Sequence, residues 1–326
     1  MKLTRRTFIT SAAAMATIVA KPAILRAAEP LMFGFLPGNS IHWIADVLVE
    51  KGFLKDVGFD LQFSTMQSSP QSIQWAVAGA YQIAASQPEP FIAAVERGAD
   101  SLAAISAPMN RADWVLNGAP GITSVKDLKG KTIGVSALRN SEVWLTTQLL
   151  EKAGLNKGEY DFIVAGTSPA KVIALQKGAI AAAVMFQPSA ELAITQGLAA
   201  LAYYGNLRAY PPTLYVVNKE WAAKGDAGKR VAHALGRGHA WLWDPNNRAE
   251  ATQILSKYTK REQPIVDAVY EDYFVKGKIY SKAGEIELDG LNRALADMAS
   301  DGELIKVPAP PATKYVLDRS LGGLAR

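Results

Sequence analysis

The chain has no cysteine and only three histidines among its 326 residues. The absence of cysteine excludes thiol nucleophiles, iron–sulfur clusters, cysteine-ligated zinc and lipid attachment at a signal-peptide cysteine. The histidines are not spaced four residues apart on one helix face, so we expect no metal site; they are His42, His233 and His239. No apolar run approaches the roughly 18–20 residues of a membrane-spanning helix.

Motifs typical of common enzymes are also missing. No Gly-x-Ser-x-Gly turn is present to carry a hydrolase serine. The stretch Gly130-Lys131-Thr132 lacks the upstream glycine of a Walker loop, and no Gly-x-Gly-x-x-Gly follows a strand. A glycosidase pair stays open, because two carboxylates can meet across a cleft from any spacing. We expect no catalysis and no cofactor.

The positive net charge of +5 comes from the first 28 residues. This segment contains no acidic residue, and its basic residues are Lys2, Arg5, Arg6, Lys21 and Arg26. Without these five, the 35 basic residues fall to 30 and equal the 30 acidic ones. The pI of about 9.2 therefore predicts no nucleic-acid partner. The remaining chain, at 49% hydrophobic and 20% charged residues, has the composition of a globular protein.

Residues 1–28 have the pattern of an export signal. A basic start precedes a short apolar stretch at 8–20, and the small residues Ala27 and Ala28 follow. Residues 4–9 resemble the twin-arginine signal. A Sec-type signal with two adjacent arginines is the alternative. By either route, we expect a soluble protein in the periplasm without a lipid anchor.

Beyond residue 30, short apolar runs alternate with helical periods. We expect strands at 31–36, 61–66, 81–85, 102–106, 132–135, 161–164 and 181–186. We expect helices at 41–54, 91–97, 141–153, 231–243, 246–258 and 264–275, helix caps at Ser69-Pro70 and Ser168-Pro169, and a capping-box variant at Ser124–Asp127. The alternation predicts an α/β fold with mostly parallel sheets in two lobes, at about 31–110 and 113–212, and a mostly helical third block that returns to one of them.

Small polar and aromatic residues follow these strands. Ligands of open α/β sheets bind beyond the carboxyl ends of strands, and two lobes offer the cleft between them. Several of these residues also precede a helix, where free N–H groups favour an anion or an oxygen-rich ligand; each polar residue alone could equally be a helix cap. The candidate ligand-binding residues are Asn39, His42, Trp43, Gln67, Ser68, Ser86, Gln87, Ser136, Arg139, Asn140, Ser141, Thr167, Phe186 and Gln187.

Three of these side chains suggest specific roles. Trp43 and Phe186 could sandwich a flat or apolar ligand. Arg139 could form a bidentate pair with a carboxylate or sulfonate, or face solvent at the cleft rim. We also expect one nearby tyrosine to reach the cleft, from Tyr203, Tyr204 and Tyr210.

Four stretches carry a family resemblance: residues 50–54 (EKGFL), 76–84 (AVAGAYQIA), 122–135 (ITSVKDLKGKTIGV) and 174–188. Over about 30–260 the chain resembles the solute-binding proteins of ABC importers, in the group with sulfonate-, taurine- and nitrate-binding and thiamine-precursor (NMT1/THI5-like) proteins. Gln82 and Ala182 stand where acidic residues are usual in that group, and Phe186-Gln187 where Trp-Glu is common. The resemblance therefore concerns architecture and does not identify a ligand.

The resemblance implies the two-lobe type II fold of periplasmic binding proteins. Lobe 1 would comprise 29–112 and 213–326, and lobe 2 would comprise 113–212, with hinges near 110–113 and 210–213. A small organic solute (a sulfonate, carboxylate, pyrimidine or other aromatic) would be captured by hinge closure. The partners would be an inner-membrane ABC permease with its separate ATPase, and we expect a monomer.

Two alternatives remain. The chain could be a binding module that feeds a periplasmic sensor, which would differ only in its docking partner. An enzyme of the pyrimidine-precursor synthase type shares this fold, but those proteins carry a cysteine-rich iron motif that this chain lacks.

Overall fold

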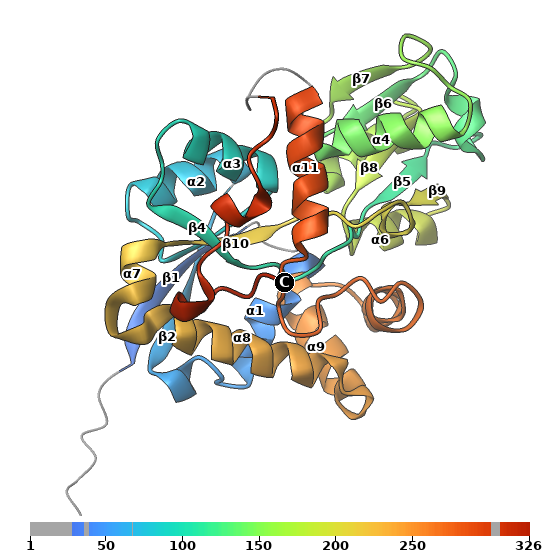
Figure 1. Cartoon of the computed structure of the whole chain (residues 1–326). Coiled ribbons are helices and arrows are strands. Elements are labelled where there is room, and N and C mark those ends of the chain that lie inside the picture. Colours follow the sequence, from blue (N-terminus) through green and yellow to red (C-terminus); the bar gives the residue numbers. More distant parts are fainter. Residues whose placement is uncertain (1–27, 36–38, 67, 301–306) are drawn as a thin grey trace, which may run out of the picture.

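The computed structural model describes residues 28–35, 39–66, 68–300 and 307–326. Its described strands form two five-stranded sheets, flanked by helices (Figure 1). The first sheet contains β1 (Glu29–Phe35), β2 (Phe59–Thr65), β3 (Ile83–Ser86), β4 (Leu102–Ser106) and β10 (Leu214–Asn218). The second contains β5 (Val115–Gly118), β6 (Thr132–Val135), β7 (Asp161–Val164), β8 (Ala182–Met185) and β9 (Ala199–Tyr203). The expected export signal lies outside the described residues, except for Ala28.

Both sheets are mixed. Their strand orders are β2-β1-β3-β10-β4 and β7-β6-β8-β5-β9. β10 runs antiparallel to β3 and β4, and β5 runs antiparallel to β8 and β9. Each antiparallel strand is the first one after the chain has passed from one sheet to the other, through segments 107–114 and 204–213. The parallel strands therefore direct their carboxyl ends, and the loops that follow them, toward one edge of each sheet.

Helices follow most of the parallel strands. They are α1 (Trp43–Glu50), α2 (Ser69–Val77), α3 (Pro88–Glu96), α4 (Ser141–Lys152), α5 (Ser168–Gln176) and α6 (Ser189–Thr195). The later helices are α7 (Lys219–Ala223), α8 (Ala227–Trp243), α9 (Arg248–Thr259), α10 (Gln263–Tyr270) and α11 (Leu288–Ser300). In the carboxyl-terminal block, α8 and α9 pack on α1, which follows the first strand of the first sheet. α11 packs on α3, and its Ala294 joins the core of the second sheet beside Trp114.

The structure confirms most of the expected strands and corrects several caps. Ser124 and Asp127 form the predicted capping box. The residue that caps α2 is Ser68 rather than Ser69, and Thr167 rather than Ser168 precedes α5, because proline fits the second helical position at both sites. β5, β9 and β10 are absent from the expected strands, and the antiparallel pairs of both sheets involve these three strands.

Candidate ligand-binding site

A small cavity of about 30 Å³ lies where the two sheets face each other. The chain contributes to it from the loop before α1, the ends of β2 and β3, the end of β8 and the return segment before β10. Its lining residues are Asn39, Ile41, His42, Met66, Ser69, Ala85, Ser86, Gln87, Phe186, Pro212 and Thr213. Five of them are candidates from the sequence: Asn39, His42, Ser86, Gln87 and Phe186. We call this space the interlobe cavity.

Local capping holds the first-sheet loops in place. The Asn39 side chain accepts a hydrogen bond from the Ile41 N–H (3.0 Å) and begins a short 3-10 turn at Ser40–His42. Ser69 Oγ accepts from the Gln87 N–H (3.1 Å), and so ties the start of α2 to the end of β3. Ser86 Oγ donates to the Gln87 carbonyl (2.8 Å). These contacts fix the cavity wall before any ligand binds.

His42 is enclosed by aromatic rings. Its ring stacks on Tyr215 at 6.0 Å and meets Phe35 edge-on at 5.4 Å. Burial lowers the pKa of His42 to about 3, so the imidazole is neutral at physiological pH. A neutral imidazole beside the cavity can take part in hydrogen bonding or stacking, but it supplies no positive charge to an anion.

Trp43 does not reach this cavity, and the predicted sandwich with Phe186 is wrong. Its ring is 0% exposed, packs against Tyr270 and Phe274, and donates its indole N–H to the Ala251 carbonyl (3.0 Å). Adjacent helical residues point in different directions, and His42, one position earlier, is the one that faces the cavity.

A direct backbone hydrogen bond joins the two sides of the site. The Ser40 N–H donates to the Gln187 carbonyl (3.2 Å). The Ser40 hydroxyl lies 2.6 Å from Tyr273 Oη, and Tyr273 donates to Asp113 Oδ2 (2.5 Å). Because a phenol has one proton, Ser40 must be the donor to Tyr273. This chain of contacts links the first sheet's loop to the segment that enters β5, and the site is nearly shut.

On the second sheet, a buried ion pair supports Phe186. Lys171 Nζ lies 3.0 Å from Glu142 Oε2, and both side chains are 0% exposed. Lys171 also donates to Ser136 Oγ (2.9 Å) and to the Val184 carbonyl (2.7 Å), and it lies 5.7 Å from the centre of the Phe186 ring. Glu142 stands near several lysines in the sequence, which predicts a solvated face for it; that prediction is wrong, because the side chain is buried. Lys171 carried no sequence signal, since lysine is rarely buried without a partner.

The backbone N–H groups at and before the start of α4 already donate to side chains of the protein. Glu142 accepts from the Ser136 N–H (2.9 Å), and Asn140 caps the helix by accepting from the Val143 N–H (3.4 Å). Tyr210 donates to the buried Glu89 of α3, and burial raises the pKa of Glu89. Ser141 is 0% exposed and does not line the interlobe cavity.

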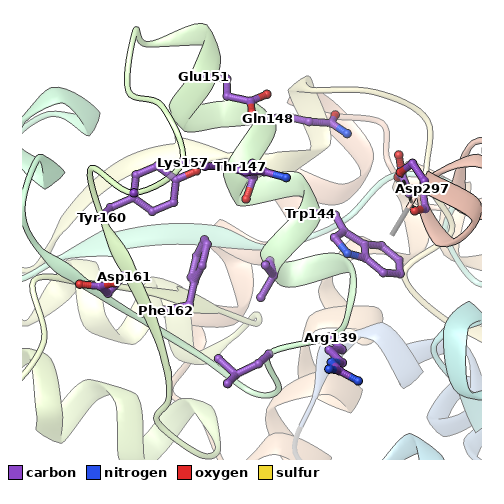
Figure 2. Close-up of a pocket in the computed structure, with 14 residues that line it drawn as sticks. Arg139, Trp144, Thr147, Gln148, Glu151, Lys157, Tyr160, Asp161, Phe162 and Asp297 are labelled. Atoms are coloured by element: carbon purple, nitrogen blue, oxygen red, sulfur yellow. Dashed lines mark hydrogen bonds between the residues drawn. The ribbon is translucent and has the colours of Figure 1, made fainter. Parts of the chain in front are cut away.

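Several other candidates lie away from the interlobe cavity. Arg139 lines a separate outer pocket of about 650 Å³ between α4 and β7, together with Tyr160 and Phe162 (Figure 2). Ser68, Ser136 and Thr167 are exposed, and Gln67 lies outside the described residues. Of the three tyrosines, none lines the interlobe cavity: Tyr204 and Tyr210 are buried, and Tyr203 lines a neighbouring cavity with Gln187. Met66, Ser69 and Thr213 line the cavity but are not among the candidates from the sequence. Met66 and Ser69 belong to the same strand-end loop as the candidates Gln67 and Ser68, whereas Thr213 carried no signal.

The described residues were also compared with the requirements of a metal site and of a membrane-spanning helix, and meet neither. No group of three or more histidine, aspartate or glutamate side chains in this part of the chain is arranged to hold a metal ion. None of the described helices is long and apolar enough to cross a membrane.

The architecture matches solved structures of binding proteins. The alkanesulfonate-binding protein SsuA from Xanthomonas axonopodis pv. citri, bound to MOPS, is 17% identical, with a TM-score of 0.71 over 88% of this chain and 99% of SsuA. The periplasmic nitrate-binding protein NrtA from Synechocystis PCC 6803 is 15% identical, with a TM-score of 0.74 over 90% of this chain and 87% of NrtA. The desulfurization enzyme DSZB is 12% identical, with a TM-score of 0.66 over 90% and 97%. The chain thus has the periplasmic-binding-protein fold.

The family follows from the sequence itself. The family model described as NMT1/THI5 like matches residues 42–249, and the chain belongs to this family. No curated protein matches the chain. The resemblance stated above is therefore confirmed at the level of family and fold.

Proposed function

We propose that this protein captures a small organic solute in the interlobe cavity and delivers it to an ABC importer. The observation that carries the proposal is the convergence of Asn39, His42, Ser86, Gln87 and Phe186, from loops of both sheets, on one cavity. Family membership and the binding-protein fold support it.

Capture would proceed by hinge closure. The two lobes are 29–112 with 213–326, and 113–212, and they rotate about segments near 110–113 and 210–213. A cavity of about 30 Å³ has room for about one water, so the solute must enter a more open form. The solute favours the closed form because it contacts both lobes there. The shift toward closure equals the difference between its binding free energies in the closed and open forms. Opening would break the hydrogen bond between Ser40 and Gln187.

The remaining parts of the proposal concern the cell. Residues 1–28 direct export to the periplasm, by the twin-arginine route or the Sec route. The mature protein acts as a soluble monomer, binds no nucleic acid, and docks on a membrane permease that has a separate ATPase. A sensor kinase is the alternative docking partner, and the genes beside this one discriminate between the two.

A catalytic role is the competing function, because DSZB, an enzyme, has a similar fold. We propose binding without turnover. The test is native mass spectrometry of the protein purified from its own cells, followed by incubation with the released compound. A small solute that is held and recovered unchanged supports the proposal, whereas its conversion to a product supports the enzyme.

Phe186 supplies a residue-level test. We expect Phe186→Ala to weaken binding of the released solute at least about tenfold, since buried aromatic contacts dominate binding energies. Phe162→Ala, which removes a half-buried ring of the same sheet outside the cavity, is the matched control and should bind as the parent does. Equal affinities in isothermal titration calorimetry for all three proteins would place the solute elsewhere.

A further inference from the structure

A second and larger cavity, of about 360 Å³, lies beside the segment that enters β5. We call it the hinge cavity. It shares no lining residue with the interlobe cavity, and its volume falls in the range of roughly 300–1,000 Å³ that small organic ligands occupy. Its walls come from the start of β5, the end of β9 and the π-helical turn η7 (Glu271–Lys276).

One buried carboxylate at this cavity is incompletely paired. Asp113 is 4% exposed and lines the cavity. Tyr273 donates to its Oδ2 (2.5 Å), whereas Oδ1 has no hydrogen-bond partner, although the Gln187 backbone lies near enough to lower the pKa of Asp113. Because Oδ1 is itself covered, a cation in the cavity would stabilise this carboxylate through its charge rather than through a hydrogen bond to Oδ1.

The charge of the lining is negative overall. Asp272 is the second carboxylate, and its Oδ2 accepts a long hydrogen bond from Gln187 Nε2 (3.4 Å). Among the described residues that line the cavity, Lys276 is the only cationic side chain. Burial and the charge of the nearby Asp272 raise the pKa of Glu191. An added anion would therefore meet repulsion, and an added cation would be attracted.

Aromatic rings supply the apolar part of the lining. Tyr203 is 41% exposed and faces the same cavity as Tyr273 and Trp114. The indole N–H of Trp114 is buried and has no acceptor. Rings of this kind attract organic cations through their negative faces and also pack against an apolar body.

We infer that the hinge cavity binds a small organic cation, in which a primary ammonium or amidinium group faces Asp113 and Asp272 and an apolar body lies against Trp114 and Tyr203. Burial raises the pKa of Asp113 to about 6, and it also raises the pKa of Asp272, although the charge of the nearby Lys276 opposes that rise. This site is separate from the interlobe cavity, and the inference does not depend on the proposed function.

The test uses three probes with one ring and different charge: benzylammonium, benzyl alcohol and benzenesulfonate. Isothermal titration calorimetry at pH 8 keeps Asp113 ionised and the amine protonated. We expect benzylammonium to bind at least tenfold more tightly than benzyl alcohol. We expect benzenesulfonate, whatever it binds in the interlobe cavity, to leave the Trp114 indole N–H resonance of the hinge cavity unshifted. Failure of benzylammonium to bind the folded parent, or a larger shift of that resonance by benzenesulfonate than by benzylammonium, overturns the inference.

Variants then locate the site. Asp113→Asn keeps the size and an acceptor for Tyr273 but removes the charge, so benzylammonium affinity should fall at least tenfold. The control is Asp100→Asn, at an exposed carboxylate remote from the cavity, which should bind as the parent does. If circular dichroism shows that Asp113→Asn does not fold, Asp272→Asn is held to the same criterion. Unchanged affinity in the folded charge-removing variant, or a Trp114 indole N–H resonance that benzylammonium does not shift, contradicts the assignment.

Discussion

Removal of the buried ammonium of Lys171 is the most informative perturbation of the second sheet. The side chain is 0% exposed and has three acceptors for its three protons: Glu142, Ser136 and the Val184 carbonyl. In Lys171→Met the apolar stem keeps much of its packing, while Glu142 remains buried without its countercharge. Its remaining donors are the Ser136 N–H (2.9 Å) and the Asn140 amide (3.4 Å).

The expected cost follows from that uncompensated carboxylate. Breaking a buried ion pair by removing one partner costs about 3–5 kcal/mol. In a protein of this size about 1 kcal/mol changes the thermal midpoint by a few degrees, so Lys171→Met should lower it by about 10 °C. If the loss arises from the charge left on Glu142, adding Glu142→Gln should recover about half of it or more.

Differential scanning calorimetry of four proteins tests this reasoning. They are the parent, Lys171→Met, the double variant with Glu142→Gln, and Lys177→Met, which removes an exposed lysine at the end of the same helix. The Lys177 variant should melt within about 2 °C of the parent, since solvated surface substitutions change little. A Lys171→Met midpoint equal to that of the control, or a double variant less stable than Lys171→Met, would refute the account of this ion pair.

Two further predictions concern pH. Burial lowers the pKa of His42 to about 3, whereas the unfolded chain has a pKa of about 6.5. Below pH 6.5 the unfolded chain therefore binds a proton that the folded protein does not, and the free energy of unfolding falls. Between pH 7 and 5, urea titrations should show that His42→Phe loses about 2 kcal/mol less of this free energy than the parent does. The pKa of Asp113 is raised to about 6, so this group instead destabilises the fold as pH rises through 4–6. Between pH 4 and 7, the free energy of unfolding of Asp113→Asn should therefore rise by about 2–3 kcal/mol relative to that of the parent. A difference between the two proteins that does not change with pH would contradict the raised pKa of Asp113.

The sequence predicted the strand ends well because each is marked by a change of residue type. The apolar runs at 102–106, 132–135 and 161–164 have the same bounds as β4, β6 and β7. The residues directly after β3 and β8, polar Gln87 and aromatic Phe186, are brought to one cavity by the fold. Within one sheet, parallel strands direct their carboxyl ends to one edge, so each position is predictable without the strand order. The meeting of Gln87 and Phe186, which follow strands of different sheets, depends on how the two sheets face each other.

What the sequence could not predict depends on long-range packing. β5 and β10 are short strands whose antiparallel pairing is set by neighbours far along the chain. Trp43 and His42 are adjacent, and only the position of α1 against α9 and α10 decides which of them faces the core. The burial of Lys171 likewise required Glu142, 29 residues away, to lie beside it.

The position of the solute tests the central claim most directly. A crystal structure of the protein purified with its natural solute should show density between the loops of the two sheets, in contact with Phe186 and Gln87 and in a cavity wider than that described above. Solute density at the outer pocket beside Arg139, with the interlobe cavity unchanged, would contradict the account.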